Sequence, residues 1–305
     1  MQSSRIVVLD IIRCLAIALL LTGHTNQFLG SPLGGSFGIR NFYWVSLGGI
    51  AVTLFFILSG LTLELKYGSK LIRYKDFIIR RVERIYPVYY LCLVLGIAVA
   101  LSQQHAIAFH WSDPLLAVSG FYAFAGKWGG PFVRTSWFLG PILVMYSVYP
   151  ALSGAMAKYG KLRVLALLLL ISIVFRLLLG NDILSLPRRP LDWFPLCRVF
   201  EFGLGVYIGK AVVHSNRFRF RFRYPVLNGC LAALGTLSFP LFLVHLMFGF
   251  VIADLARSGI PVPVAVTIYV MLVVLLARAI DIIDQRMQFA SSSRTRSALQ
   301  LGCQR

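Results

Sequence analysis

Three ionisable residues interrupt an apolar segment near the start of the chain. Asp10, Arg13 and His24 lie within residues 9–24, LDIIRCLAIALLLTGH. A histidine exchanges protons near neutral pH, and an arginine binds anions through several hydrogen bonds. On a helix, His24 lies about 20° past three full turns from Arg13 and about 16 Å further along the axis. The three side chains are therefore predicted to share one helix face. We favour a functional face over an Asp10–Arg13 pair that only anchors the helix end.

A second basic cluster lies at residues 80–90, RRVERIYPVYY. Arg80, Arg81 and Arg84 are three and four positions apart, so a helix crowds their guanidinium groups on one side. Like charges repel one another, whereas a phosphate-bearing ligand would bind such a cluster through paired hydrogen bonds. A basic anchor on the cytoplasmic side of the membrane explains the same residues, and both interpretations stay open.

Four further candidate residues lie in apolar segments. Ser59 precedes Gly60 in a pattern typical of close helix packing. Trp137 is expected near the outer membrane interface, where tryptophan is enriched. Ser238 and His245 are seven positions apart and are expected on one helix face.

The remaining acidic and thiol groups predict no metal centre. Glu201 and Arg198 are three positions apart in an apolar segment, where an unpaired charge is costly, so we expect them to pair. The five cysteines are scattered without a CxxC spacing, which indicates neither a zinc site nor a disulfide framework.

The composition is that of a multi-pass membrane protein. Of 305 residues, 58% are apolar and 13% are charged, and the mean hydropathy is +0.77. The apolar runs are near the length of about 20 residues that a membrane helix needs, and they lack the alternation of a β-barrel strand. We predict an all-α polytopic transmembrane helix bundle of about 8 spans (8–10). The first segment is expected to be a retained helix rather than a cleaved signal peptide. The spans are expected at residues 6–24, 44–63, 85–103, 137–156, 162–180, 196–213, 234–255 and 262–284, with 111–125 as an ambiguous interfacial or re-entrant segment.

Basic residues set the expected topology. The formal charge is +19, and most of the basic residues between spans fall on one side if the N-terminus is cytoplasmic. This distribution explains the charge without nucleic-acid binding, which we do not expect. Residues 1–286 are predicted to form one transmembrane domain and residues 287–305 a basic polar cytoplasmic tail. Arginine and phenylalanine alternate over residues 217–223, a pattern suited to binding membrane lipid.

Six motifs in this order resemble the acyltransferase 3 family of bacterial integral membrane proteins. They are the LDxxR…H segment with Arg13-x10-His24, FFILSG, RRxxR followed by IYPVYY, WFL…Y…YP, RxFEFGLG and LGTLSFPLFLVH. They extend from about residue 5 to residue 245. Many family members have an acidic pair after the tryptophan motif, and Ile142 and Leu143 occupy those positions here.

The resemblance implies an O-acyltransferase of the bacterial cytoplasmic (inner) membrane. Such an enzyme transfers an acyl group, commonly acetyl, from cytoplasmic acyl-coenzyme A to a hydroxyl of an extracytoplasmic glycan, and polysaccharide biosynthesis machinery is a possible partner. Acyl-coenzyme A would be a donor substrate and not a permanently bound cofactor. By resemblance, His24 and Arg13 are the expected catalytic residues, and Arg80, Arg81 and Arg84 the expected coenzyme A-binding residues.

Two other functions stay open from the sequence. A transporter of a glycan or lipid-linked sugar could use the same arginines along a substrate path, although no internal repeat is visible. An inactive scaffold of a polysaccharide machine is the third interpretation.

Overall fold

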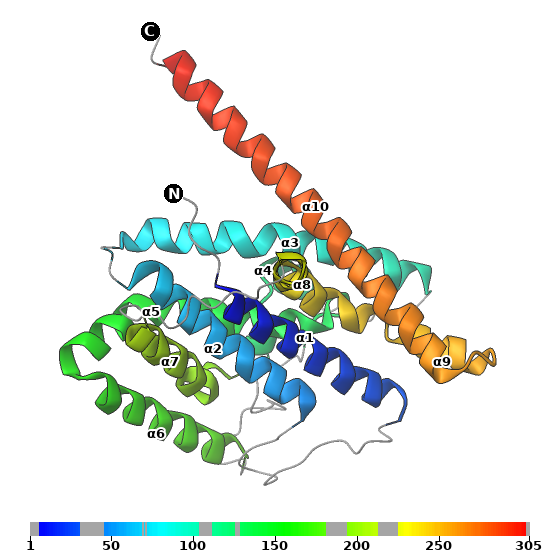
Figure 1. Ribbon diagram of the computed structural model, residues 1–305, viewed down its shortest axis with the longest axis horizontal. Coiled ribbons are helices and arrows are strands. Elements are labelled where there is room, and N and C mark those ends of the chain that lie inside the picture. Colours follow the sequence, from blue (N-terminus) through cyan, green and yellow to red (C-terminus); the bar gives the residue numbers. More distant parts are fainter. Residues whose placement is uncertain are drawn as a thin grey trace.

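Helices make up all the regular secondary structure in the described part of the chain, as predicted, and the computed structural model arranges them in one bundle (Figure 1). It describes residues 6–30, 46–68, 70, 72–103, 112–125, 129–180, 194–212 and 225–302, with side chains as far as residue 289. The α-helices are α1 (Val7–Phe28), α2 (Leu47–Tyr67), α3 (Tyr74–Ser102), α4 (Asp113–Ser119), α5 (Leu139–Tyr159), α6 (Lys161–Gly180), α7 (Pro195–Val212), α8 (Pro225–Val244), α9 (Phe250–Arg257) and α10 (Val262–Gly302). Three short 3₁₀ helices are η1 (Tyr122–Ala125), η2 (Arg134–Phe138) and η4 (His245–Phe248).

Seven helical segments in the described part are long and apolar enough to cross a membrane. They are α1, α2, α3, η2 with α5, α6, α8 with η4, and α10 as far as Phe289. The remaining predicted span, 196–213, corresponds to α7, which is helical but carries Arg198, Glu201 and Lys210 within its 18 residues. The ambiguous segment 111–125 holds only the seven-residue α4 and the four-residue η1, both far too short to span a bilayer.

The predicted span 234–255 is wrong in its bounds. Helix α8 begins earlier, at Pro225, and ends at Val244, before η4 and the separate α9. Side chains of η2 and α10 hydrogen-bond the backbone carbonyls at this end. Thr135 donates to the Leu243 carbonyl at 3.0 Å, and Tyr269 donates to the His245 carbonyl at 2.9 Å. An α-helix can end inside the protein when its last carbonyls find such partners.

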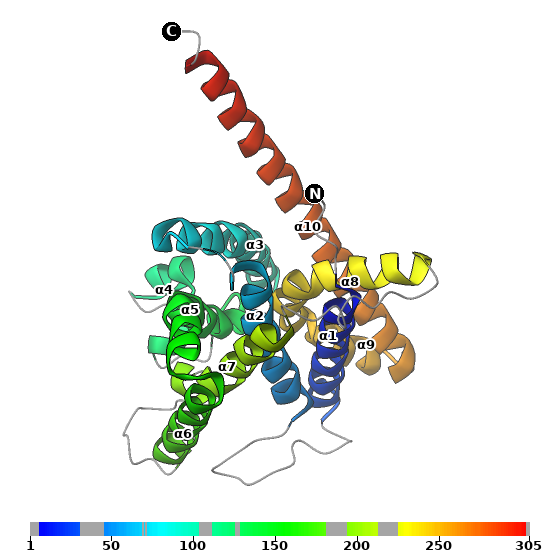
Figure 2. The ribbon, with the colours of Figure 1, turned by 60° about the vertical axis from the view of Figure 1, so that its left-hand side comes forward.

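Helix α2 occupies the middle of the bundle, with α1 on one side and α7 on the other (Figure 2). The contact with α7 depends on glycine. A Cβ at Gly60 would lie 2.1 Å from the Phe202 carbonyl oxygen, and a Cβ at Gly205 would lie 2.0 Å from that of Ile57. The two backbones therefore touch, which confirms the close packing predicted at Ser59–Gly60.

Five helices close a ring in the order α1, α2, α5, α3 and α8, each contacting the next. Helix α6 packs outside this ring against α7 and α5, and α10 packs against α8 and α3. The helices of the ring are the ones that position the candidate site.

Helix α10 continues through the segment predicted as a polar tail. Its backbone is helical for 41 residues, to Gly302, and Figure 1 shows its C-terminal part extending beyond the other helices. The Arg-Phe segment at residues 217–223 lies outside the described residues.

Candidate functional site

A cavity of about 190 Å³ opens inside the five-helix ring. Each helix of the ring contributes to its wall, and the lining residues are Arg13, Phe55, Leu58, Ser59, Thr62, Leu63, Lys66, Arg81, Arg84, Ile85, Phe138, Ile142, Tyr146, Ser238, Phe239 and Phe242. The predicted candidates Arg13, Ser59, Arg81, Arg84 and Ser238 are therefore brought together from four helices.

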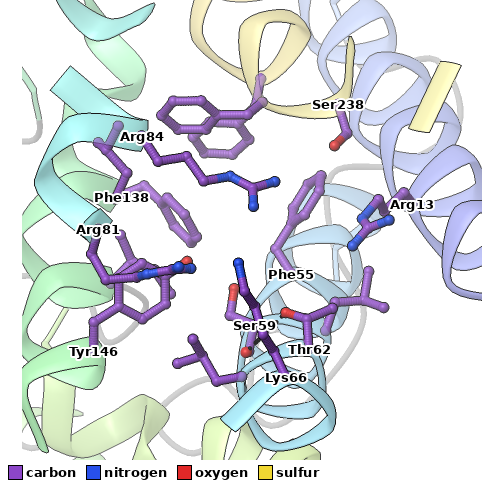
Figure 3. Close-up of a pocket in the computed structure, with 16 residues that line it drawn as sticks. Arg13, Phe55, Ser59, Thr62, Lys66, Arg81, Arg84, Phe138, Tyr146 and Ser238 are labelled. Atoms are coloured by element: carbon purple, nitrogen blue, oxygen red, sulfur yellow. Dashed lines mark hydrogen bonds between the residues drawn. The ribbon is translucent and has the colours of Figure 1, made fainter. Parts of the chain in front are cut away.

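Four cationic side chains surround this cavity. Arg13 comes from α1, Lys66 from α2, and Arg81 and Arg84 from α3, and Figure 3 shows all four extending into the same space. The described lining includes no carboxylate. Four cations from three helices around a cavity whose described lining holds no carboxylate favour an anionic ligand.

Arg13 is held by an acidic neighbour behind the cavity. Its Nη1 donates to Oδ1 of Asp10 at 2.8 Å, and Asp10 is only 1% exposed. A Cβ at Gly235 of α8 would lie 2.7 Å from that same oxygen. The Asp10 carboxylate therefore holds the Arg13 guanidinium where α1 meets α8, so the Asp10–Arg13 pair is present and one of its members lines the cavity.

The Arg81 guanidinium is buried, and not all of its hydrogen-bond donors are used. It is 7% exposed, its Nη2 donates to the Tyr67 hydroxyl at 2.9 Å, and it lies over the rings of Tyr67 and Phe77. Its Nε has no hydrogen-bond partner among the described residues. A buried donor without a partner is costly, so a ligand at this position would stabilise it.

Arg80 departs from the expected three-arginine cluster. It is exposed on α3 and does not line the cavity, because consecutive helix residues point about 100° apart. Lys66, which the sequence analysis did not select, takes the third position beside Arg81 and Arg84. Lys66, Arg81 and Arg84 lie together at one end of the cavity, which we name the basic end.

His24 lies at the other end of α1 and contacts His245. The two imidazole centroids are 4.9 Å apart. His24 Nδ1 lies 2.9 Å from Oε1 of Gln27, and His245 Nδ1 lies 2.9 Å from the Phe242 carbonyl. A backbone carbonyl only accepts, so Nδ1 of His245 carries the proton and its Nε2 presents a lone pair. His245 is fully buried, and its Nε2 has no partner in the described part of the chain.

The shared face of Asp10, Arg13 and His24 is confirmed, because Asp10 meets Gly235 of α8, His24 meets His245 directly after α8, and Arg13 shares the cavity with Ser238. His24 and His245 nevertheless do not line the cavity. Ser238 lies on α8 and lines the cavity, whereas His245 begins η4 and lies outside it. We name the His24–His245 contact the histidine end.

Trp137, which was expected near the outer membrane interface, is buried inside the bundle. It is 6% exposed and packs against Phe138, whose ring lies 6.0 Å away. The 3₁₀ turn η2 directs both rings into the core, so Trp137 supports the cavity wall rather than an interface.

Glu201 pairs with Arg198 at 3.1 Å, as predicted, but the pair has a third member. Arg176 of α6 reaches the same carboxylate oxygen at 2.9 Å. All three are buried, outside the cavity, and they join α6 to α7. A lone arginine in a leucine-rich span was the sequence signal that could have identified Arg176.

Glu64 forms a second buried cluster that the sequence analysis missed. Its carboxylate accepts from Lys210 at 2.9 Å, from Tyr149 at 3.0 Å and from Ser153 at 2.8 Å. These contacts clamp α2, α5 and α7 together. No group of three or more His, Cys, Asp or Glu among the described residues could hold a metal ion.

The apolar helices and the cavity lined by four cations define a multi-pass membrane protein with a basic interior cavity. The acyltransferase-domain family model Acyl_transf_3 matches residues 6–230, most of the chain. The chain belongs to this acyltransferase 3 family and is a membrane acyltransferase. No curated protein and no solved structure matches it. The family match ends before Ser238 and His245, and the structure places Ser238 in the cavity wall and His245 against His24.

Proposed function

We propose that the protein transfers an acetyl group from cytoplasmic acyl-coenzyme A to a hydroxyl of an extracytoplasmic glycan. The convergence of Arg13, Lys66, Arg81 and Arg84 on one cavity carries this proposal. In it, the membrane is the bacterial inner membrane, the basic end is cytoplasmic, and the histidine end is extracytoplasmic. This orientation follows the positive-inside distribution of lysine and arginine.

The basic end suits the donor. Coenzyme A carries a pyrophosphate and a further phosphate, and guanidinium groups bind phosphates through charge-assisted hydrogen bonds. With the phosphates at Lys66, Arg81 and Arg84, the pantetheine arm extends inward past Arg13. The distance from Lys66 to Phe55 along α2 is about 16 Å, which gives the arm a deep, increasingly apolar channel.

The histidine end suits the acceptor. His24 Nε2 accepts the proton of the acceptor hydroxyl, while the hydroxyl oxygen forms a bond to the thioester carbonyl carbon. The carbon–sulfur bond then breaks, and the proton passes to the sulfur. The products are an O-acyl ester and coenzyme A with a free thiol. His245 packs against His24 and fixes its ring for this step.

Everted membrane vesicles, which expose the cytoplasmic face, test the proposal. Radiolabelled acetyl-coenzyme A is added, and label is measured in the extracted glycan. We expect label to appear with the wild-type protein, and an apparent KM about tenfold higher with Arg84→Gln, as for loss of one charged hydrogen bond. Arg80→Gln is the matched control on the same helix and should behave as wild type.

Two results would overturn the proposal. One is no label above vesicles that lack the protein. The other is equal KM values for Arg80→Gln and Arg84→Gln, which would leave the cavity without a role in donor binding.

A further inference from the structure

Three phenylalanine rings close the inner end of the cavity. Phe138 and Phe242 have centroids 4.9 Å apart, Phe55 and Phe242 5.6 Å, and Phe55 and Phe138 6.5 Å. These are packed aromatic contacts, and the rings form a triangle in which each touches the other two. Phe138 and Phe242 are almost fully buried. We name this triangle the aromatic floor.

The floor separates the two ends of the site. On α2, Phe55 is the lining residue furthest from Lys66, and on α8, Phe242 is the one nearest the histidine end. The Phe242 ring lies 6.0 Å from the His245 ring, which in turn lies 4.9 Å from that of His24. The Phe242 ring thus both lines the cavity and contacts the histidine pair.

We propose that the aromatic floor sets the length of the acyl chain that the protein transfers. This inference rests on the proposed function and goes one step beyond it. A thioester whose coenzyme A is bound at the basic end presents its acyl group to the floor. An acyl chain of two carbons needs a small displacement of one ring to reach the histidine pair. A chain of six carbons needs the space that the rings themselves occupy.

The close packing of the floor is the physical basis of this selectivity. Packed interiors have few voids larger than a water molecule, and adding methylene groups to a filled space is destabilising. Replacing a phenylalanine by alanine opens a cavity that apolar groups can occupy. Shortening one ring of the floor should therefore extend the range of acyl chains without altering the basic end.

Phe55→Ala is the test variant, and Phe56→Ala is its matched control. Phe56 is the next residue on α2, is fully buried and packs 5.1 Å from Phe138, yet it does not line the cavity. Everted vesicles receive equal concentrations of acetyl-, butyryl- and hexanoyl-coenzyme A, and mass spectrometry measures the acyl groups on the glycan. Protein in the membrane is quantified for each variant.

We expect the wild type to transfer mainly acetyl. Phe55→Ala should raise the hexanoyl-to-acetyl ratio at least tenfold, while Phe56→Ala leaves it unchanged. If Phe55→Ala is absent from the membrane, Phe55→Leu and Phe242→Leu replace it and should raise the butyryl-to-acetyl ratio. An unchanged ratio in the floor variants, or a wild type that transfers hexanoyl as readily as acetyl, overturns this inference alone. A wild type that transfers no acyl group overturns the proposed function instead.

Discussion

His24 and His245 come from opposite ends of the chain and meet with their ring centroids 4.9 Å apart. His24 is the histidine of the first membrane helix, and His245 begins the 3₁₀ turn that follows α8. Nδ1 of His24 is hydrogen-bonded to the Gln27 side chain, whereas His245 donates from Nδ1 to a backbone carbonyl and has no described partner at Nε2. This contact places a polar, proton-accepting centre directly behind the aromatic floor.

Replacing His245 should slow transfer without weakening donor binding. His245 does not line the cavity, so His245→Asn is expected to lower kcat while KM for acetyl-coenzyme A stays at the wild-type value. The loss should be smaller than the roughly hundredfold loss expected when the base itself is removed. Steady-state transfer in everted vesicles measures both constants. Equal changes in kcat and KM would indicate a general packing defect rather than a positioning role.

Replacing Asp10 should weaken donor binding without slowing transfer. Asp10→Asn removes the carboxylate that fixes Arg13 and should raise KM for acetyl-coenzyme A by about tenfold with little change in kcat. Asp76→Asn is the control, because Asp76 pairs with the exposed Arg73 at 3.5 Å and does not line the cavity. If the two variants give the same KM, Asp10 does not position Arg13 for the donor.

Glu201 should matter for stability rather than for the reaction. Glu201→Ala leaves the buried Arg176 and Arg198 without the carboxylate they share, a change that typically costs about 3–5 kcal/mol. Thermal unfolding of the purified protein in detergent should show a clear fall in Tm. Asp254→Ala, which removes an exposed pair with Arg257, should change Tm little. A Tm for Glu201→Ala equal to that of Asp254→Ala would contradict a structural role.

The fold was largely predictable because membrane helices are specified by local composition. Apolar runs of about 20 residues located the helices, and the i, i+3 spacing correctly paired Arg198 with Glu201. The Asp10–Arg13 pair, an alternative to a purely functional face, is also present. The end of α8 was not predictable, since the carbonyl partners that allow it come from Thr135 and Tyr269.

Most residues of the candidate site were predictable from the sequence. The separation of the basic end from the histidine end was not. Helical spacing indicated a common face for Arg13 and His24, and both lie on the α8 side of α1. The aromatic floor between them comes from three helices distant in sequence, so no local pattern reveals it. For the same reason, the approach of Arg176 to Glu201 and of Lys66 to Arg81 and Arg84 required the tertiary structure.

The most direct test of acyl transfer by His24 compares glycan acylation in cells with wild-type protein and in cells with His24→Ala at matched protein levels. Mass spectrometry of the surface glycan gives its acyl content. If His24 is the catalytic base, acyl groups are lost from the glycan while the amount of polymer stays constant. Unchanged acylation in His24→Ala cells would contradict the catalytic role of His24. Loss of the polymer itself would indicate transport rather than acyl transfer.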